Sequence, residues 1–230
     1  MAQSEPRPAP APAGVLRSGI CAFHGVATLW GPANPHPPTD VIADARPNGF
    51  WRLTTLLLPG LGDSGPAHWQ SQWERMDPTC RRVRQAEWDR ADRAGWVRTL
   101  DAAISAERGP LVLAAHSTAC LLVAHWAAGA SAAQLGRVVG ALLVAPSDPE
   151  GPRYPDGPTG WAPVPVQRLP FRSIVVASTD DEYVSLERAR EFADAWGSRL
   201  VVAGARGHLN ADSALGSWPD GRRLLDELRT

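Results

Sequence analysis

Three sets of polar residues that could carry out acyl transfer together each follow an apolar stretch of the chain. Ser117 lies in Ala-Ala-His-Ser-Thr-Ala, Asp180 and Asp181 lie in Thr-Asp-Asp-Glu, and His208 ends Gly-Ala-Arg-Gly-His. A serine hydroxyl is a weak nucleophile near neutral pH and needs a base within hydrogen-bonding reach. A histidine can take the proton, and a carboxylate can fix the imidazole tautomer and stabilise its cation. These residue types predict hydrolysis through an acyl-enzyme, with Ser117 as nucleophile and His208 as base.

Ser117 lies where a predicted strand over Leu111–Ala115 meets a predicted helix over Thr118–Ala128. A nucleophile elbow has this context, because it is a strained strand-to-helix turn with small residues two positions before and after the serine. Ala115 and Ala119 occupy those positions instead of the commoner glycines. The pattern by itself also fits an ordinary serine N-cap at the start of a helix, so the assignment depends on the acid and the base.

The acid and the base follow later strands, in the chain order serine, aspartate, histidine that is typical of α/β-hydrolases. The two aspartates follow a predicted strand over Ser173–Ser178, and His208 follows the last predicted strand. Asp181 is preferred to Asp180 as the acid because Val184 gives it the Asp-x-x-Val spacing of a usual acid loop.

The backbone N–H groups of Leu61 and Thr118 are the predicted donors to the oxyanion of the tetrahedral intermediate. Such donors contribute ~3–4 kcal/mol each to the stability of the transition state. Thr118 begins the helix after the nucleophile, and Leu61 lies in the loop after the first strand.

The same loop also fits a dinucleotide-binding pattern. The run GLGDSG at 60–65 matches G-x-G-x-x-G after a strand, and Glu87 stands where a ribose-binding acid is expected. Pro59 and Pro66 flank the run, and the residues after it predict a turn where a phosphate-binding helix should begin. A Rossmann protein would also leave the serine, aspartate and histidine unexplained, so it is the less favoured alternative.

The elements that must position these residues alternate between short apolar runs and longer amphipathic ones. Continuous apolar strands between helices are typical of a parallel sheet covered on both faces. The sequence therefore predicts a compact three-layer α/β/α hydrolase fold with a mostly parallel sheet of five or six strands. The insertion over 146–170 is too short for a large lid. Predicted strands cover Leu53–Leu58, the region of Val83, Leu111–Ala115, Val138–Ala145, Ser173–Ser178 and Leu200–Ala203; predicted helices begin near Ala67 or cover Trp96–Glu107, Thr118–Ala128, Leu186–Trp196 and Gly221–Leu228.

Length and composition suit one folded domain with an N-terminal extension. The chain has 230 residues, of which 44% are hydrophobic and 20% charged, and this is enough for one α/β domain with its own core. Residues 1–50 are rich in Pro and Ala without periodicity, so we expect them to be disordered or loosely packed. The hydrolase domain is expected over 51–230.

Charge and cysteine usage argue against several classes of function. A net charge of −1 predicts no nucleic-acid or membrane-surface partner. All 23 basic residues are arginine, which excludes a lysine nucleophile or Schiff base. Cys21, Cys80 and Cys120 have neither metal nor disulfide-framework spacing. We therefore expect a cytoplasmic protein without metal or cofactor, and nothing in the sequence indicates a protein partner.

Longer motifs surround these residues: LLLPGLGDSGPAHWQSQWE, AAHSTAC, VAPSD, ASTDDEYVS, WGSRLVVAGARGHLN and SWPDG. Together they resemble the YdeN-like serine hydrolases, also called the retinoblastoma-binding-protein-nine family, over about residues 53–230. The resemblance implies a compact α/β-hydrolase with a triad at Ser117, Asp181 and His208, and it does not supply a substrate. The chain departs from the family pattern at Ala119, where glycine is commoner, and at Glu182, where proline often follows the acid.

We expect small or short-chain carboxylic esters as substrates, because no large lid is predicted over the site. The alternative from another class is a protein-binding module on a hydrolase scaffold whose triad is unused. His68, Trp69 and Trp73 are expected to pack the first helix on the sheet rather than line the acyl pocket, and Cys120 is expected to be a buried thiol.

Overall fold

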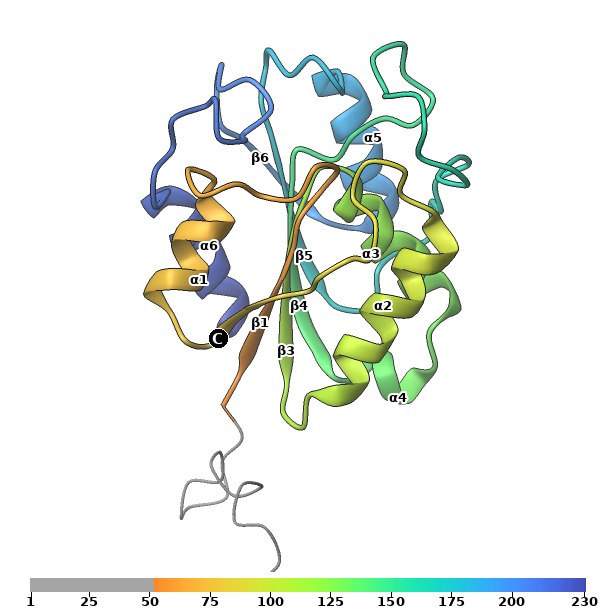
Figure 1. Ribbon diagram of the computed structural model, residues 1–230, viewed down its shortest axis with the longest axis vertical. Coiled ribbons are helices and arrows are strands. Elements are labelled where there is room, and N and C mark those ends of the chain that lie inside the picture. The colour runs from red at the N-terminus through yellow and green to blue at the C-terminus, as the bar shows by residue number, and fades with distance from the viewer. Residues whose placement is uncertain (1–51) are drawn as a thin grey trace, which may run out of the picture. The chain divides into compact units, whose positions relative to one another are not determined.

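The computed structural model describes residues 52–230, so the predicted extension over 1–50 lies outside the described residues. Six parallel strands form one sheet in the order β2-β1-β3-β4-β5-β6, and helices cover both faces (Figure 1). This is the predicted three-layer α/β/α fold. The strands are β1 (Thr54–Leu58), β2 (Cys80–Arg82), β3 (Leu111–His116), β4 (Val138–Val144), β5 (Arg172–Ala177) and β6 (Arg199–Val202). The helices are α1 (Trp69–Met76), α2 (Arg93–Ala106), α3 (Thr118–Gly129), α4 (Ala132–Leu135), α5 (Leu186–Trp196) and α6 (Pro219–Arg229).

The central strands β3 and β4 are apolar over nearly their whole length because both of their faces are covered. In β3, Leu111 and Leu113 face the hydrophobic cluster that includes α2, α3 and α5. Val112 and Ala114 alternate with them and face the cluster that includes α1 and α6. Every residue of β3 is buried, and such an uninterrupted apolar run is what a central parallel strand requires.

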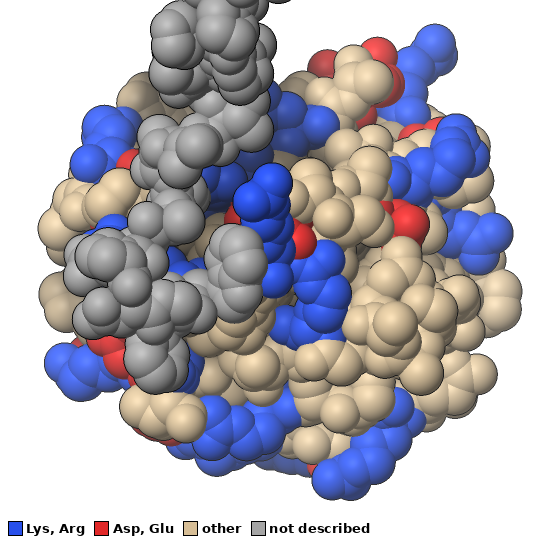
Figure 2. Space-filling view, turned by 90° about the horizontal axis from the view of Figure 1, so that it is seen from below, with Lys and Arg blue, Asp and Glu red and all other residues tan. Residues whose placement is uncertain are grey.

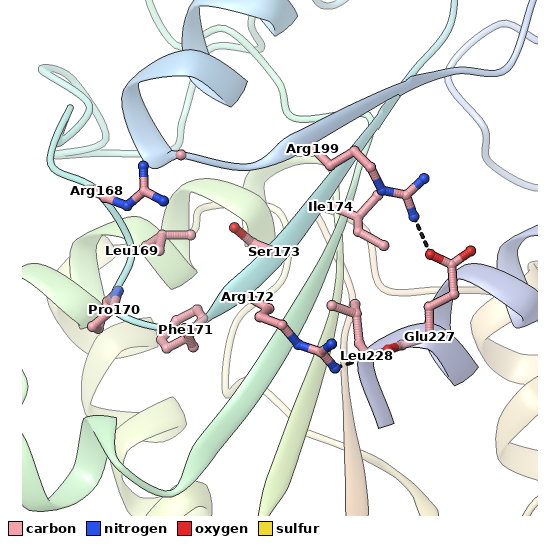
Figure 3. Close-up of a pocket in the computed structure, with 11 residues that line it drawn as sticks. Arg168, Leu169, Pro170, Phe171, Arg172, Ser173, Ile174, Arg199, Glu227 and Leu228 are labelled. Atoms are coloured by element: carbon pink, nitrogen blue, oxygen red, sulfur yellow. Dashed lines mark hydrogen bonds and ion pairs between the residues drawn. The ribbon is translucent and has the colours of Figure 1, made fainter. Parts of the chain in front are cut away.

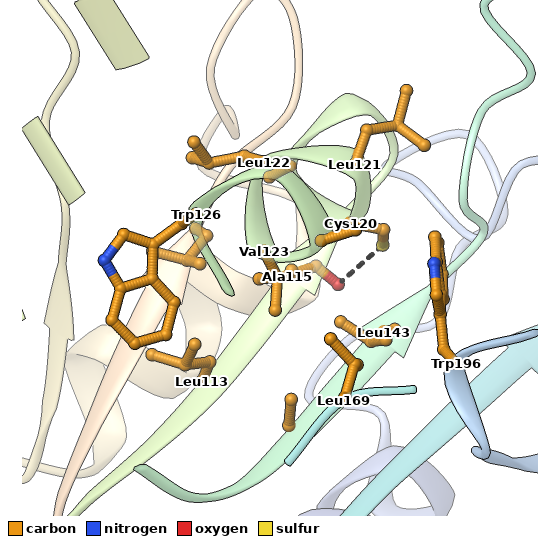
Figure 4. Packing of buried hydrophobic residues seen from close by; sticks show 14 of the residues in the cluster. Leu113, Ala115, Cys120, Leu121, Leu122, Val123, Trp126, Leu143, Leu169 and Trp196 are labelled. Carbon is orange, nitrogen blue, oxygen red and sulfur yellow. Dashed lines mark hydrogen bonds between the residues drawn. The ribbon is translucent and has the colours of Figure 1, made fainter. Parts of the chain in front are cut away.

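Tryptophans fill much of the space between the sheet and the two helical layers. Trp69 and Trp73 of α1 pack on one face, close to Trp218 before α6. On the other face, Trp126 of α3 lies against the sheet, and Cys120 is buried in the same layer as expected of an apolar thiol (Figure 4). The aromatic side chains therefore belong largely to the two cores.

Some boundaries differ from the sequence prediction. The strand β2 ends at Arg82, before the Val83 around which it was predicted. The helix α4 was not predicted, since it is a single turn whose stability is local: Gln134 N–H donates to Ser131 Oγ, and Ser131 N–H donates to Gln134 Oε1. By contrast, the predicted helix over Leu186–Trp196 is α5 itself.

The order of the strands reverses at β1. The strand β2 is added on one side of β1 and all later strands on the other. Open α/β sheets bind ligands at the carboxyl ends of the strands at such a switch point, and here the loop after β1 meets the end of β3. The chain over 145–171 contains no helix and no extended strand, so among residues 52–230 this insertion does not form a large lid. In the described part of the chain, none of the helices has the length and apolar character required to span a membrane.

Candidate active site

Ser117 occupies a strained turn between β3 and α3. Its φ of 60° and ψ of −130° lie in a region that residues other than glycine adopt at a cost of about 1–3 kcal/mol. The serine of a nucleophile elbow has such a conformation. Ala115 and Ala119 are fully buried beside the turn, where an elbow requires small residues. A Cβ at Gly60 would lie 2.7 Å from Ser117 Cβ, so the loop after β1 approaches the turn closely.

The structure brings Ser117, His208 and Asp181 together. Ser117 Oγ lies 2.9 Å from His208 Nε2, and His208 Nδ1 lies 2.9 Å from each carboxylate oxygen of Asp181. The Asp181 side chain is fully buried, and that of His208 is 9% exposed. Because a carboxylate only accepts hydrogen bonds, the imidazole proton resides on Nδ1 and Nε2 is free to accept from Ser117. This arrangement can activate a serine hydroxyl.

Asp180, the other candidate for the acid, makes different contacts from Asp181. Its Oδ1 accepts hydrogen bonds from Ser178 Oγ and from the Gly207 N–H, both at 2.7 Å. These hydrogen bonds, that of Ser178 foremost, lower the pKa of Asp180. Asp180 therefore joins the loop after β5 to the loop after β6, while Asp181 contacts His208.

Two buried side chains hold the backbone at His208. His116 Nε2 donates to the His208 carbonyl at 2.9 Å, and Trp69 Nε1 donates to the Leu209 carbonyl at 3.0 Å. Burial holds the pKa of His116 well below its ordinary range, so this ring is neutral. His116 was not predicted as a site residue, and its position next to Ser117 was the one sequence feature that could have indicated this role.

A pocket of about 240 Å³ opens beside Ser117. Leu61 lines it, and Thr118 begins α3, where the first N–H groups of a helix have no intrahelical partner. The roles of Leu61 and Thr118 as oxyanion donors stay predictions. His68 also lines the pocket although it is only 4% exposed, and burial, helped by the charge of Arg82, lowers its pKa to about 4. His68 is therefore buried and also lines the pocket, whereas Trp69 and Trp73 pack in the core.

Ser147 is a residue of the site that the sequence analysis missed. It lies in the loop after β4, is 3% exposed, and places its Oγ 2.8 Å from Ser117 Oγ. The strands β3 and β4 are neighbours, and the Ser117 N–H donates to the Val144 carbonyl at 2.9 Å. The contact therefore comes from strand pairing; the motif VAPSD contains Ser147, but nothing in its spacing indicated a contact with Ser117.

A tyrosine of the insertion between β4 and β5 also approaches the site. The Tyr154 hydroxyl lies 3.3 Å from Thr118 Oγ1, and burial raises the pKa of Tyr154 to about 12. The phenol is therefore neutral and serves as a hydrogen-bonding group beside the first residue of α3.

The glycine-rich loop after β1 serves the close approach to Ser117. A dinucleotide-binding loop leads directly into its helix, whereas here residues 65–68 intervene before α1 begins, with His68 as the N-cap. Arg82 donates to Asp63 Oδ1 and to the Ser64 carbonyl. The loop is therefore held by Arg82 and by its packing on the turn at Ser117, and a dinucleotide-binding role explains neither contact.

A larger hollow of about 570 Å³ lies near the amino ends of β5 and β6 (Figure 3). Arg199 forms an ion pair with Glu227 there, and Arg172 donates to the Glu227 carbonyl at 2.9 Å. Arginine side chains are scattered among uncharged residues over this end of the molecule (Figure 2). Among the described residues that line the hollow there is no histidine or cysteine.

The sequence matches the serine hydrolase family over residues 55–227, whereas the curated proteins contain no match to it. A YdeN-like hydrolase from Pectobacterium atrosepticum is 34% identical, with a TM-score of 0.66, over 77% of this chain and 91% of that one. The ydeN gene product of B. subtilis is 15% identical, with a TM-score of 0.59, over 77% of this chain and 99% of that one. Esterase 2 of Thermogutta terrifontis is 18% identical, with a TM-score of 0.57, over 80% of this chain and 85% of that one. The last two likenesses concern the fold alone, but the family match and the Pectobacterium relative identify this chain as a member of the serine hydrolase family, with the α/β-hydrolase fold.

Proposed function

We propose that the protein hydrolyses small carboxylic esters through an acyl-enzyme, with Ser117 as nucleophile, His208 as general base and acid, and Asp181 as the residue that orients His208. The observation that supports this most directly is the continuous line of hydrogen bonds, each of 2.9 Å, from Ser117 Oγ through the imidazole to the Asp181 carboxylate. A serine paired in this way loses its proton to histidine as it attacks a carbonyl carbon.

The reaction has two halves that use the same imidazole. In acylation, Ser117 Oγ bonds to the ester carbon while its proton passes to His208 Nε2, and the proton then passes to the departing alcohol oxygen. In deacylation, a water gives one proton to Nε2 as its oxygen bonds to the acyl carbon, and the proton returns to Oγ as the acid leaves. The buried Asp181 carboxylate stabilises the imidazolium in both halves.

The backbone N–H groups of Leu61 and Thr118 are the proposed donors to the oxyanion in both halves. Leu61 lines the pocket beside Ser117, and Thr118 follows Ser117 at the first turn of α3. The helix N-terminus adds a favourable partial charge for the developing anion. The loss of one such donor would cost ~3–4 kcal/mol of transition-state stabilisation.

The size of the pocket supports small substrates. A volume of about 240 Å³ lies below the ~300–1,000 Å³ of pockets that hold drug-sized ligands. The esterase from Thermogutta terrifontis shares the fold, and an ester is the simplest acyl compound that the proposed residues can cleave. Acetate and butyrate esters are therefore expected to be turned over faster than long-chain esters.

A panel of esters and amides, together with a fluorophosphonate probe, tests this proposal. The wild-type protein should be labelled by the probe and should hydrolyse short esters. Ser117→Ala should lose both properties, and His208→Ala should lose nearly all turnover while it stays folded by circular dichroism. An unlabelled, folded wild-type protein would favour a binding module on a hydrolase scaffold. Turnover of long-chain esters much faster than that of butyrate would contradict the substrate size.

A further inference from the structure

We infer that Ser147 positions the water that cleaves the acyl-enzyme, a role that rests on the proposed function of Ser117 and His208. The hydroxyl of Ser147 lies 2.8 Å from Ser117 Oγ, and its residue is 3% exposed. Ser117 Oγ therefore has two hydrogen-bonding partners, the second being His208 Nε2 at 2.9 Å.

The proton count fixes the direction of these two hydrogen bonds. His208 carries its proton on Nδ1, towards Asp181, so Nε2 accepts from the Ser117 hydroxyl. Ser117 has one hydroxyl proton, and that proton is directed to Nε2. The contact with Ser147 therefore has Ser147 as donor and Ser117 Oγ as acceptor. This bond holds Oγ in place, but the attack of Oγ on a substrate does not require it.

The order of the strands places Ser147 on the same side of Ser117 as the base. The strands β1 and β4 flank β3 on opposite sides, and β5 and β6 lie beyond β4. Leu61 follows β1 and Ser147 follows β4. These two residues therefore come from strands on opposite sides of β3, the strand that precedes Ser117. Ser147 therefore follows a strand on the same side of β3 as β6, the strand that precedes His208, and it lines the pocket.

Acylation changes what the Ser147 hydroxyl can contact. Once Oγ carries the acyl group it is an ester oxygen and a poor acceptor, and Ser147 no longer needs to donate to it. The attacking water must then lie against His208 Nε2 and next to the carbon bonded to Oγ. Because Nε2 and Ser147 Oγ both contact Ser117 Oγ, the gap between them is at most two hydrogen-bond lengths, which one water can bridge.

The step balances without a net change at Ser147. One hydrogen of the water passes to His208 Nε2, and the water oxygen bonds to the acyl carbon. The second hydrogen stays on that oxygen and is donated to Ser147 Oγ as a hydrogen bond. The bond between the acyl carbon and Ser117 Oγ then breaks, Oγ takes the proton from His208, and the free acid departs. Ser147 acts as a positioning residue for deacylation.

The test separates the two halves of the reaction in Ser147→Ala. The rate of fluorophosphonate labelling reports attack by Ser117 alone and should stay within about threefold of wild type. Steady-state hydrolysis of p-nitrophenyl butyrate should fall about tenfold, the size expected for one hydrogen bond in the transition state. Intact-protein mass spectrometry during turnover should show butyryl-Ser117 accumulating in the variant more than in wild type.

Two further variants control for structural effects. Ser147→Cys leaves no cavity, because sulfur is larger than oxygen, but it supplies only a weak acceptor. It should therefore slow turnover as Ser147→Ala does, whereas a loss caused by a cavity would disappear. Ser173→Ala removes one member of another serine pair, in which Ser173 Oγ lies 2.6 Å from Ser198 Oγ at the far end of β5, and it should leave both rates unchanged.

The results would distinguish this inference from the proposed function. Labelling and turnover that fall by the same factor in Ser147→Ala, or that both stay at the wild-type level, would overturn the role of Ser147 in deacylation. Activity that persists in Ser117→Ala would instead overturn the proposed function itself.

Discussion

The close contact between Gly60 and the turn at Ser117 leads to a sharp prediction for Gly60→Ala. The added Cβ would lie 2.7 Å from Ser117 Cβ, 3.0 Å from the His116 carbonyl oxygen and 3.2 Å from Ser117 Oγ. Non-bonded carbon atoms prefer separations of about 3.5–4.0 Å, so the loop and the turn must separate by close to 1 Å. The two nearest neighbours, Ser117 Cβ and the His116 carbonyl oxygen, are fixed by the backbone and cannot rotate away. The displacement therefore reaches Ser117, the proposed nucleophile.

The size of the effect follows from this displacement. A shift of about 1 Å at a reacting group lowers the rate by roughly 100-fold, and overpacking a buried site costs about 1–3 kcal/mol of folding free energy. Gly60→Ala should therefore lose about two orders of magnitude in kcat/KM for p-nitrophenyl butyrate while it remains folded. The rate of fluorophosphonate labelling should fall by a similar factor, because labelling depends on the same oxygen.

A matched substitution separates this contact from the general effect of replacing glycine by alanine. Gly129 ends α3, the helix that Ser117 precedes, and a Cβ there would meet no atom within 4 Å. Gly129→Ala should keep wild-type activity and be at least as stable as wild type in urea unfolding followed by circular dichroism. If Gly60→Ala retained more than about a third of the wild-type labelling rate, the turn would tolerate the displacement and this reasoning would be refuted.

Two further predictions concern the acidic residues and the buried histidines. Asp181→Asn should lower kcat by a thousandfold or more, roughly the effect expected when the imidazole tautomer is no longer held. Asp180→Asn should lower kcat by less than about tenfold, because its amide oxygen can still accept from Gly207 N–H. Equal losses of ester turnover in the two variants would contradict the assignment of Asp181 as the acid. The pKa of His68 is lowered from its ordinary value of 6.5 to about 4, chiefly by burial. As the pH falls below 6.5, His68 therefore becomes protonated in the unfolded chain but stays neutral in the folded protein. The free energy of unfolding should therefore fall by up to about 1.4 kcal/mol per pH unit between those values from this group, with a further loss from His116, whose pKa is also lowered. Urea unfolding at a series of pH values should show a shallower slope in His68→Gln, and an unchanged slope would exclude this origin.

The sheet was predictable from sequence because burial on two faces leaves a strong local signal. A central parallel strand such as β3 is apolar at nearly every position, and the run at Leu111–Ala115 shows this without any knowledge of its neighbours. The helix α5 was equally clear, since a serine N-cap at Ser185 and a left-handed Gly197 mark its two ends. The single turn α4 has no core-facing pattern and gave no comparable signal.

The site residues that could be predicted from sequence are those that directly follow a strand and stand in a characteristic order along the chain. Ser117, Asp181 and His208 each follow a strand, and parallel strands bring their carboxyl ends to one edge of the sheet. The contacts of Ser147 and of His116 depend on which strands are neighbours and on how a loop folds back. Such contacts join residues far apart in the chain, and no spacing within the sequence encodes them.

The backbone conformation of Ser117 lowers the stability of the protein at the residue that we propose as its nucleophile. At φ 60° and ψ −130° a side chain is strained, and glycine adopts such a conformation readily. Ser117→Gly should therefore be an inactive protein that is harder to unfold, by about 1 kcal/mol or more, than the active one. A selection for thermal stability alone would therefore favour the loss of the proposed nucleophile.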